Sequence, residues 1–437
     1  MNMIKKHILI ASITLLSTPL LFGQSLINSP YSRFGIGEIE NRGFSMNRAM
    51  GNLSTGIRKP NQINFQNPAS IGAQDTMSFI FDLGVSGISK TLGNTTTSSL
   101  YQNFYFDHLA MSFPIKRWWF LSVGLVPYSK KGYDIQTIES NDQLPDTVNA
   151  VYNYYGNGSI NQLFLSNSFK IYKNIHLGFN VSYLFGSIEQ YNILSLDRGD
   201  SYSTVNIEKT TLKKLAFDFG LQYTGSFSTK YFYTLGFVYS NKIGFNATRE
   251  NTTFMTENFI YYGMNVLDYL ATYSNYADTI LSTVDKEYKV EVPAKYSFGF
   301  SSGIKDKLTV GIDVSVQDWN GITSLNMKGN SALDINYNLG VEYIPNKFAL
   351  RNYLNLINYR AGFYYNTGYL ELNNEKISSY GITFGVGLPI ANKTTINLYY
   401  NYGVKGTTNN GLIEEKYNLF GINLTLYDFW FFKYKYE

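Results

Sequence analysis

The chain has 437 residues, with 36 lysines and arginines against 32 acids, and it contains no cysteine. A net charge of +4 on this length excludes nucleic acid as an expected partner, and the absence of cysteine excludes a disulfide framework. Charged residues are only 16% of the chain while aromatic residues reach 17%, so the composition departs from that of an average globular protein.

Residues 1–24 are predicted to be a secretory signal peptide. Lys5 and Lys6 precede an apolar run of about 17 residues that ends in small and polar residues near Gly23. A membrane-anchoring helix is the alternative, but the run is short and stands at the extreme terminus. No later run of about 18 apolar residues predicts a spanning helix. The mature chain is therefore expected outside the cytoplasm.

Residues 25–76 read as irregular, although regular strands follow them. The stretch NFQNPASIG, residues 64–72, combines a ladder-breaking Pro68 with Asn67, which favours a turn, and Gly72, which adds conformational freedom. From Met77 onward the chain alternates between apolar and polar residues. The sequence thus predicts an irregular segment in front of a regular β structure.

The alternation is clearest in LTVGIDVSVQ, residues 308–317, where every second residue is aliphatic and the others are small or polar. Similar patterns occupy residues 175–186, 215–225, 380–389 and 395–403. A period of two predicts strands with one apolar and one polar face. Both a soluble sandwich and an outer-membrane barrel satisfy this pattern.

The connections favour the barrel. Short links alternate with long ones at about 134–150, 191–203, 249–285 and 405–415, and only the link at 345–357 breaks the rule. Short periplasmic turns opposite long outer loops are typical of outer-membrane barrels. Residues 77–437 are therefore predicted to form an all-β, 14-stranded antiparallel transmembrane β-barrel in the cell outer membrane. Strands are expected to begin near 77, 101, 117, 151, 175, 204, 231, 286, 308, 331, 358, 377, 394 and 416.

Two further expectations concern the ends of these strands. Tryptophans near strand ends are expected at the membrane interfaces; they are Trp118, Trp119, Trp319 and Trp430. Within the outer loop 249–285, apolar residues recur at helical spacing, which predicts a short amphipathic helix. Its apolar face comprises Leu267, Leu270, Tyr273 or Ser274, Ala277 and Leu281.

Residues 47–73, NRAMGNLSTGIRKPNQINFQNPASIGA, resemble the N-terminal segment of the FadL-type family of long-chain fatty-acid transport barrels. The most telling residues are Met50, Gly51, Asn67, Pro68 and Ala69. Further similar stretches, spread in order over most of the mature chain, are residues 156–188, 292–319 (with Pro293, Asp313 and Trp319), 359–368 and 380–390. The resemblance implies fourteen strands and an N-terminal hatch, residues 25–76, folded inside the barrel. A periplasmic tail is the alternative for this segment.

The resemblance also implies that a hydrophobic ligand leaves sideways through a gap in the wall. Gly156 and Gly158 are candidates for that interruption, because glycine within a strand often marks a bulge; an ordinary kink explains them equally well. The chain departs from the pattern at its end, DFWFFKYKYE, where charges follow the aromatic residues. No defined set of ligand-contacting residues of the family can be matched in this chain, so the resemblance does not predict the substrate.

Asp218 and Asp313 are expected to point into the barrel, where a lone carboxylate needs a partner. The segment 25–76 supplies bases, namely Arg42, Arg48, Arg58 and Lys59. We hypothesise that one of these bases pairs with an acid and latches the hatch. A lumenal acid solvated by water is the alternative.

The sequence predicts no enzyme, no metal site and no cofactor. Its three histidines, His7, His108 and His176, are isolated, and no nucleophile or phosphate-binding motif accompanies them. Two functions remain open. One is uptake of hydrophobic small molecules through a plugged lumen; the other is that of an accessory or shuttle subunit of a multiprotein outer-membrane secretion or assembly complex. The expected partners are outer-membrane lipid with either a hydrophobic ligand or a protein of such a complex.

Overall fold

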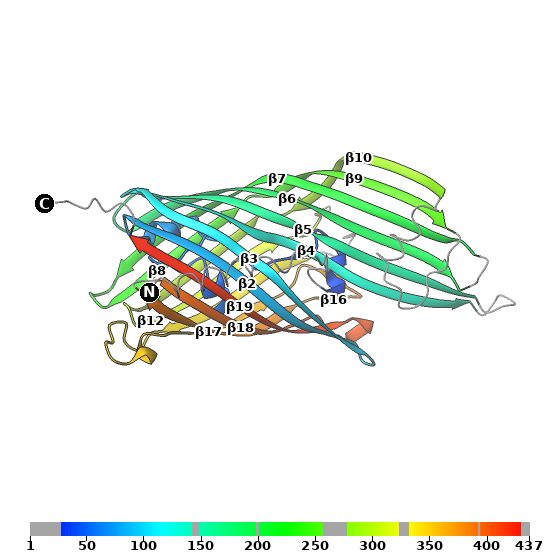
Figure 1. Cartoon of the computed structure of the whole chain (residues 1–437). Helices are drawn as coiled ribbons and strands as arrows, with labels where there is room; N and C mark the ends of the chain where they lie inside the picture. Colours follow the sequence, from blue (N-terminus) through cyan, green and yellow to red (C-terminus); the bar gives the residue numbers. More distant parts are fainter. Residues whose placement is uncertain are drawn as a thin grey trace, which may run out of the picture.

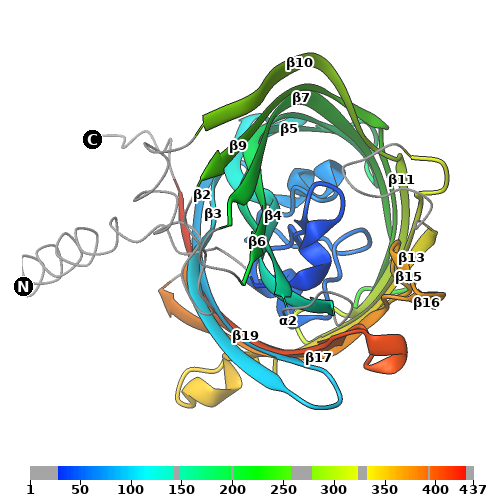
Figure 2. The same ribbon diagram turned by 90° about the vertical axis from the view of Figure 1, so that its right-hand side faces the viewer.

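The computed structural model describes residues 28–141, 148–197, 201–256, 278–322, 332–391 and 394–429. Its main sheet is antiparallel and closed, because β19 (Glu414–Phe429) pairs along its whole length with β2 (Ser78–Gly93). Figures 1 and 2 show the resulting barrel from the side and along its axis. None of the described helices has the length and apolar character needed to cross a membrane.

The wall contains fourteen strands, two of which are interrupted. β8 (Tyr231–Ser240) and β9 (Ile243–Thr256) follow one another along β7 (Ser203–Ser226). β10 (Asp278–Val292) and β11 (Lys295–Ile304) continue one another around Pro293, which cannot donate to a ladder. The remaining wall strands are β3 (Ser98–Lys116), β4 (Trp119–Asn141), β5 (Val148–Lys170), β6 (Ile175–Leu196), β12 (Leu308–Asp318), β13 (Leu333–Tyr343), β14 (Asn358–Asn366), β17 (Ser379–Ala391) and β18 (Thr394–Lys405).

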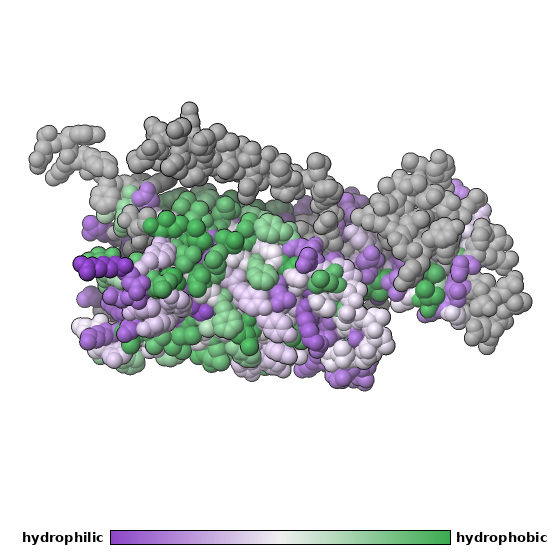
Figure 3. All heavy atoms as spheres, turned by 60° about the horizontal axis from the view of Figure 1, so that its bottom comes forward, coloured by the Kyte–Doolittle hydropathy of each residue, from purple (hydrophilic) through white to green (hydrophobic). Residues whose placement is uncertain are grey.

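The wall strands place most of their apolar residues outside and most of their polar residues inside. On β12, Val310 and Ile312 are exposed, while Thr309 before them and Asp313 after them are buried. Figure 3 shows the resulting apolar band on one face of the barrel, with hydrophilic residues gathered toward the ends. This alternation satisfies the backbone within the sheet and offers hydrocarbon to lipid. The predicted 14-stranded antiparallel outer-membrane barrel is confirmed.

The outer ends of several strands are longer than predicted. β4 and β5 occupy most of residues 134–150, and β9 and β10 occupy both ends of the predicted loop 249–285. These extensions lie beyond the apolar band, at the right of Figure 1, where both faces of a strand can be polar. The alternation that marks a membrane strand is therefore weak there, which is why sequence analysis ended these strands early.

Two predictions are wrong: that Leu281 belongs to a loop helix, and that Trp319 lies at the membrane interface. Leu281 lies in β10 and not in a helix, whereas Leu267, Leu270 and Ala277 lie outside the described residues. Trp319 is only 1% exposed and stacks inside the lumen on Tyr369, with ring centroids 4.4 Å apart. Trp118, by contrast, is exposed at the short β3–β4 turn, as expected of an interfacial ring.

Residues 28–76 lie within the ring of strands, as the blue ribbon in Figure 2 shows. This N-terminal segment contains the 3-10 helix η1 (Pro30–Arg33), the two-residue strand β1 (Glu38–Ile39), the helix α2 (Ser45–Ala49) and the 3-10 helix η2 (Pro68–Ala73). Asn67 caps η2 through its side chain, which accepts from the N–H of Ala69. Short helices and turns suit a segment whose backbone groups are satisfied by the surrounding wall.

A belt of glycines lines the wall where the N-terminal segment touches it. Eight neighbouring strands each contribute one glycine at which a Cβ would fall within 3.0 Å of an atom of residues 49–69. These close approaches need glycine because any side chain would occupy the space of the segment itself. We call this set the glycine belt; it consists of Gly178, Gly220, Gly236, Gly299, Gly311, Gly340, Gly362 and Gly385.

Replacing Gly362 with valine is expected to displace the N-terminal segment. A Cβ there would lie 2.1 Å from the Gly51 nitrogen, and overpacking of this kind costs about 1–3 kcal/mol. The matched control is Gly244→Val on β9, where a Cβ would meet nothing within 4 Å. Protease cleavage within residues 28–76, compared in detergent-purified proteins, should rise for the first variant only. Equal cleavage of both variants would refute the steric role of the belt.

Candidate functional site

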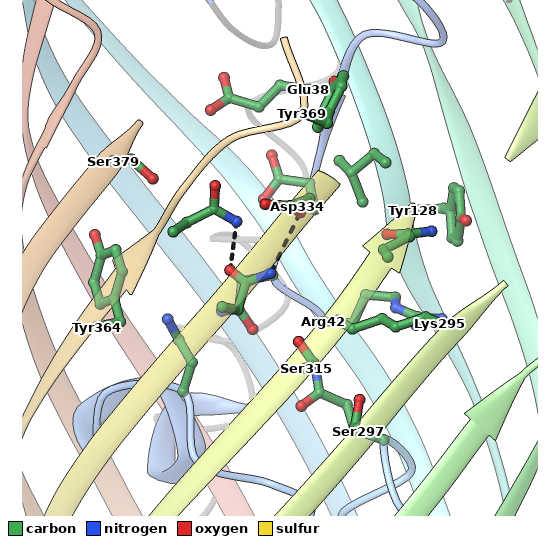
Figure 4. A pocket seen from close by; sticks show the side chains of 18 of the residues that line it. Glu38, Arg42, Tyr128, Lys295, Ser297, Ser315, Asp334, Tyr364, Tyr369 and Ser379 are labelled. Carbon is green, nitrogen blue, oxygen red and sulfur yellow. Dashed lines mark hydrogen bonds between the residues drawn. The ribbon is translucent and has the colours of Figure 1, made fainter. Parts of the chain in front are cut away.

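The lumen contains a cavity of about 360 Å³ lined by both the N-terminal segment and the wall. Figure 4 shows Glu38, Asp334 and Tyr369 together at one side, and Arg42 next to Lys295 at another. Apolar residues contribute part of the lining as well; they are Tyr128, Leu184, Ala216, Ile243, Val292 and Trp319. The cavity therefore combines charged groups with an apolar wall.

A partly buried ion-pair cluster lies at one end of this cavity. Glu38 is 2.9 Å from Lys405 and 3.6 Å from Lys90, and Lys90 is 2.7 Å from Glu415. Burial alone would raise the pKa of Glu38, but the two lysines outweigh burial and lower that pKa to about 2. Glu415 also accepts a hydrogen bond from the hydroxyl of Ser29. The beginning of the N-terminal segment is thus tied to β2, β18 and β19.

Asp313 binds a turn of the N-terminal segment through its backbone. One carboxylate oxygen accepts from the N–H groups of Ser54 and Thr55, both at 2.7 Å, and the other accepts from the N–H of Gly56 at 3.1 Å. Asp313 is buried, so these bonds replace the water that the charge has lost. The acid holds the segment, but its partners are amide groups.

The predicted pairing of Asp218 or Asp313 with a base differs from the contacts observed. Arg42 donates to Gln162 at 3.0 Å, and Arg58 donates to the Ala69 carbonyl at 3.0 Å. Asp218 accepts from Asn180 at 3.2 Å. Three adjacent N–H groups can satisfy a carboxylate without a cation, which explains why Asp313 needs no arginine. Lys59 lies 2.8 Å from Glu342, which also binds Arg360 at 2.8 Å.

Arg48, like Lys59, is a base of the segment that meets a buried acid. Its guanidinium lies 2.7 Å from Asp107 and also donates to the Gly43 and Asn41 carbonyls and to Tyr399. The contact joins α2 to β3 and β18. Each of the three guanidinium nitrogens of Arg48 donates a hydrogen bond. The buried ion pair is therefore well satisfied.

Asp107 belongs to a network that sequence analysis missed. His108 lies 2.9 Å from Asp107 and 2.6 Å from Asp82, and its ring stacks on Phe44 with centroids 3.8 Å apart. A β-bulge in β3 at this point turns two successive residues inward. Strict alternation would place Asp107 and His108 on opposite faces of β3. The sequence carries no signal for the bulge, so it could not predict that the two side chains lie together.

The wall is interrupted between β3 and β4. These strands pair only from Leu109 with Leu125 to Lys116 with Trp119. Gly156 and Gly158, predicted as the interruption, lie in β5, which is paired on both sides at these positions. That prediction is wrong because each glycine serves local packing: Gly156 leaves room for the Tyr133 ring, and Gly158 has φ +132° beside the Ser187 carbonyl.

The N-terminal segment covers the interruption. β1 pairs with β4, so that Glu38 opposes Lys130 and Ile39 opposes Ser129. Lys130 also lies 3.2 Å from Glu40 and 3.3 Å from the centre of the Tyr105 ring on β3. On the β4 side the gap is therefore lined by β1, and the buried Lys130 side chain reaches from β4 to Tyr105 of β3.

Sequence similarity covers almost the whole chain. The BamG family matches residues 3–437. The chain belongs to the BamG family. No curated protein is significantly similar to this BamG-family chain in sequence.

Solved structures share the fold of this BamG-family barrel at low identity. The toluene transporter TbuX of Ralstonia pickettii has a TM-score of 0.58 at 14% identity, covering 88% of this chain and 98% of its own. The toluene transporter TodX of P. putida has 0.57 at 12%, covering 90% and 100%. A FadL homologue of Pseudomonas aeruginosa has 0.54 at 13%, covering 91% and 99%. The FadL-type fold inferred from the sequence is confirmed, and none of these three structures is of an enzyme.

Proposed function

We propose that this BamG-family barrel is a sealed, non-catalytic subunit of a multiprotein outer-membrane complex, in which residues 28–76 form a fixed hatch. The observation that carries the proposal is the attachment of the hatch. Buried contacts of Ser29 with Glu415, of Arg48 with Asp107 and of the 54–56 turn with Asp313 tie it to strands around the lumen. Releasing the hatch would take Arg48 away from Asp107 and all three N–H partners away from Asp313, and losing the partners of buried charges is costly.

The chemistry of the cavity also favours a sealed barrel. A route for apolar molecules needs a mostly apolar lining, because contact with charged groups is unfavourable. Arg42, Lys295 and Asp334, however, face the cavity. At the interruption of the wall, Lys130 and Glu40 occupy the space between β3 and β4. Moving an apolar molecule past buried charges would strip their partners without replacing them.

A protein partner can be accommodated at the outer sheet. β10 pairs with β9 along one edge, and among the described residues no strand pairs with the other edge of Asp278–Lys289. Ile280, Leu281 and Val284 are exposed there. A strand edge that no described strand pairs with, and that carries exposed aliphatic side chains, supports addition of a strand from another protein.

Placing lysines at Ile280 and Val284 is expected to reduce recovery of a stoichiometric protein partner at least about tenfold. The partner's added strand would have to bury these lysine charges, which is unfavourable. Native mass spectrometry of the barrel, gently extracted from its own membrane, provides the measurement. Lysines at Thr96 and Ser98 in the β2–β3 hairpin, both exposed, are the matched control. A barrel that is recovered alone from native membranes, whatever the variant, would contradict the proposal.

A second function, uptake of hydrophobic small molecules, is favoured by one observation. The apolar side of the cavity, including Leu184, Ile243 and Val292, faces the same lumen in which the hatch lies. The solved relatives are described as toluene transporters and a monoaromatic hydrocarbon channel. The same mass spectra separate the two functions, since a lone barrel carrying an apolar molecule would support uptake.

A further inference from the structure

The end of the barrel with short turns, which is the periplasmic end of such barrels, carries a pronounced positive charge. The β3–β4 turn exposes Lys116 and Arg117, the β5–β6 turn exposes Lys170 and Lys173, and the β7–β8 turn exposes Lys230. None of these three turns contains an acid. The charges therefore add up along one side of the rim.

Exposed cations also occur in the short connections on the other side of this rim. The β11–β12 turn exposes Lys305 and Lys307 around Asp306, and the β13–β14 connection exposes Lys347 and Arg351. Asp306 is the single acid of these two connections, and it is paired with Lys347 at 2.6 Å. The rim thus presents an excess of cations although the net charge of the whole chain is only +4.

Apolar side chains accompany the cations in these turns. Trp118 follows Arg117, Ile171 and Tyr172 lie between two lysines, and Phe227 begins the turn that contains Lys230; all four are exposed. Cations and apolar groups at one level are typical of side chains that meet head groups and acyl chains together.

The β13–β14 connection, residues 344–357, extends this pattern away from the wall. Phe348 and Leu350 are 74% and 99% exposed. The connection is nevertheless ordered, since the Asn346 N–H donates to the Asn355 carbonyl at 2.9 Å and the Tyr353 hydroxyl donates to the Pro389 carbonyl at 3.0 Å. Figure 1 places it at the short-turn end, and Figure 2 shows it, in yellow, outside the ring of strands.

We propose that this rim binds anionic phospholipid head groups of the periplasmic leaflet, with Phe348 and Leu350 inserted among the acyl chains. A fixed loop that points sideways at the edge of the apolar band continues the surface that already faces lipid. Its exposed aliphatic groups are unfavourable in water and favourable in the leaflet. Arg351, beside them, reaches the phosphate level, as do Arg117 and Lys173 from neighbouring turns.

Retention of phosphatidylglycerol tests the charge. The protein is reconstituted with equal amounts of phosphatidylglycerol and phosphatidylcholine, and the lipids retained in native mass spectra are counted. The triple variant R117Q/K173Q/R351Q is expected to lose the preference for phosphatidylglycerol at least about fivefold. The control K213Q/K286Q/K289Q removes the same amount of charge from exposed positions of the outer sheet. This variant should keep the preference for phosphatidylglycerol. Equal preference in all three proteins would overturn the proposal.

Depth measurement tests the inserted loop. Because the chain has no cysteine, a fluorophore can be attached at Leu350→Cys and, as a control, at Thr96→Cys in the outer β2–β3 hairpin. Brominated phospholipids in vesicles are expected to quench the first label and spare the second. A label at residue 350 that lipid does not quench, but that is shielded in the native complex, would instead assign the rim to an acidic periplasmic protein and overturn the lipid proposal.

Discussion

Replacing Asp313 with asparagine is expected to loosen the 54–56 turn from the wall. The three N–H groups of Ser54, Thr55 and Gly56 converge on its two carboxylate oxygens. An amide offers one acceptor oxygen and turns an NH₂ group toward a donor, so at least one buried N–H loses its partner. Hydrogen bonds to a charged group contribute about 1.5–3 kcal/mol each, and a loss of about 3 kcal/mol is expected.

Hydrogen exchange of residues 54–56 and protease cleavage of the N-terminal segment measure this effect. Asp334→Asn is the matched control, because Asp334 lies in the lumen on β13 and accepts a hydrogen bond from Asn336 of the same strand. The exchange rates should rise in the Asp313 variant and stay unchanged in the control. Unchanged protection in both variants would show that the turn is held by the glycine belt alone.

Replacing Arg48 with methionine is expected to destabilise the barrel more than any other single change in the segment. The substitution keeps the side-chain length but leaves Asp107, buried beside His108, without its 2.7 Å partner. Removing one member of a buried ion pair costs about 3–5 kcal/mol. The free energy of unfolding in detergent, obtained from denaturant titration, should fall by this amount.

A double variant isolates the pair from the loss of packing. Adding Asp107→Asn to Arg48→Met removes the uncompensated charge, so about half of the lost stability should return. Arg42→Met serves as a comparison, because among the described residues the Arg42 side chain donates one hydrogen bond, to the neutral Gln162, and its loss should cost about 1 kcal/mol. Additive losses in the double variant would contradict the assignment of an ion pair.

The barrel itself was predictable because a membrane wall imposes period two on every strand. The alternation in residues 308–317 and the short turns determined the strand number and the direction of each face. The outer half of β10 was not predictable in the same way, since both of its faces are exposed and carry no contrast. Pro293, between β10 and β11, is the one residue in the sequence that marks where this wall strand is interrupted.

The site was less accessible to sequence reasoning. Asp313 was identified correctly as a lumenal acid that meets the segment, but its partners are backbone groups, which carry no residue signature. Asp107 and His108 act together only because a bulge turns both inward. Gly156 and Gly158 were assigned to a gap, whereas the gap between β3 and β4 arises from pairing that ends, a property that no single residue displays.

The glycine belt has a consequence for how the barrel reaches its final pairing. Slipping β14 by two residues would bring Arg360 or Tyr364 to the place of Gly362, where the backbone of Gly51 leaves no space for a side chain. A slip by one would turn the strand inside out. The other strands of the glycine belt meet the same condition, except that a slip of β17 in one direction would bring Gly387 to the place of Gly385. The N-terminal segment therefore acts as an internal gauge of strand register, and a barrel assembled around it in a shifted pairing cannot close.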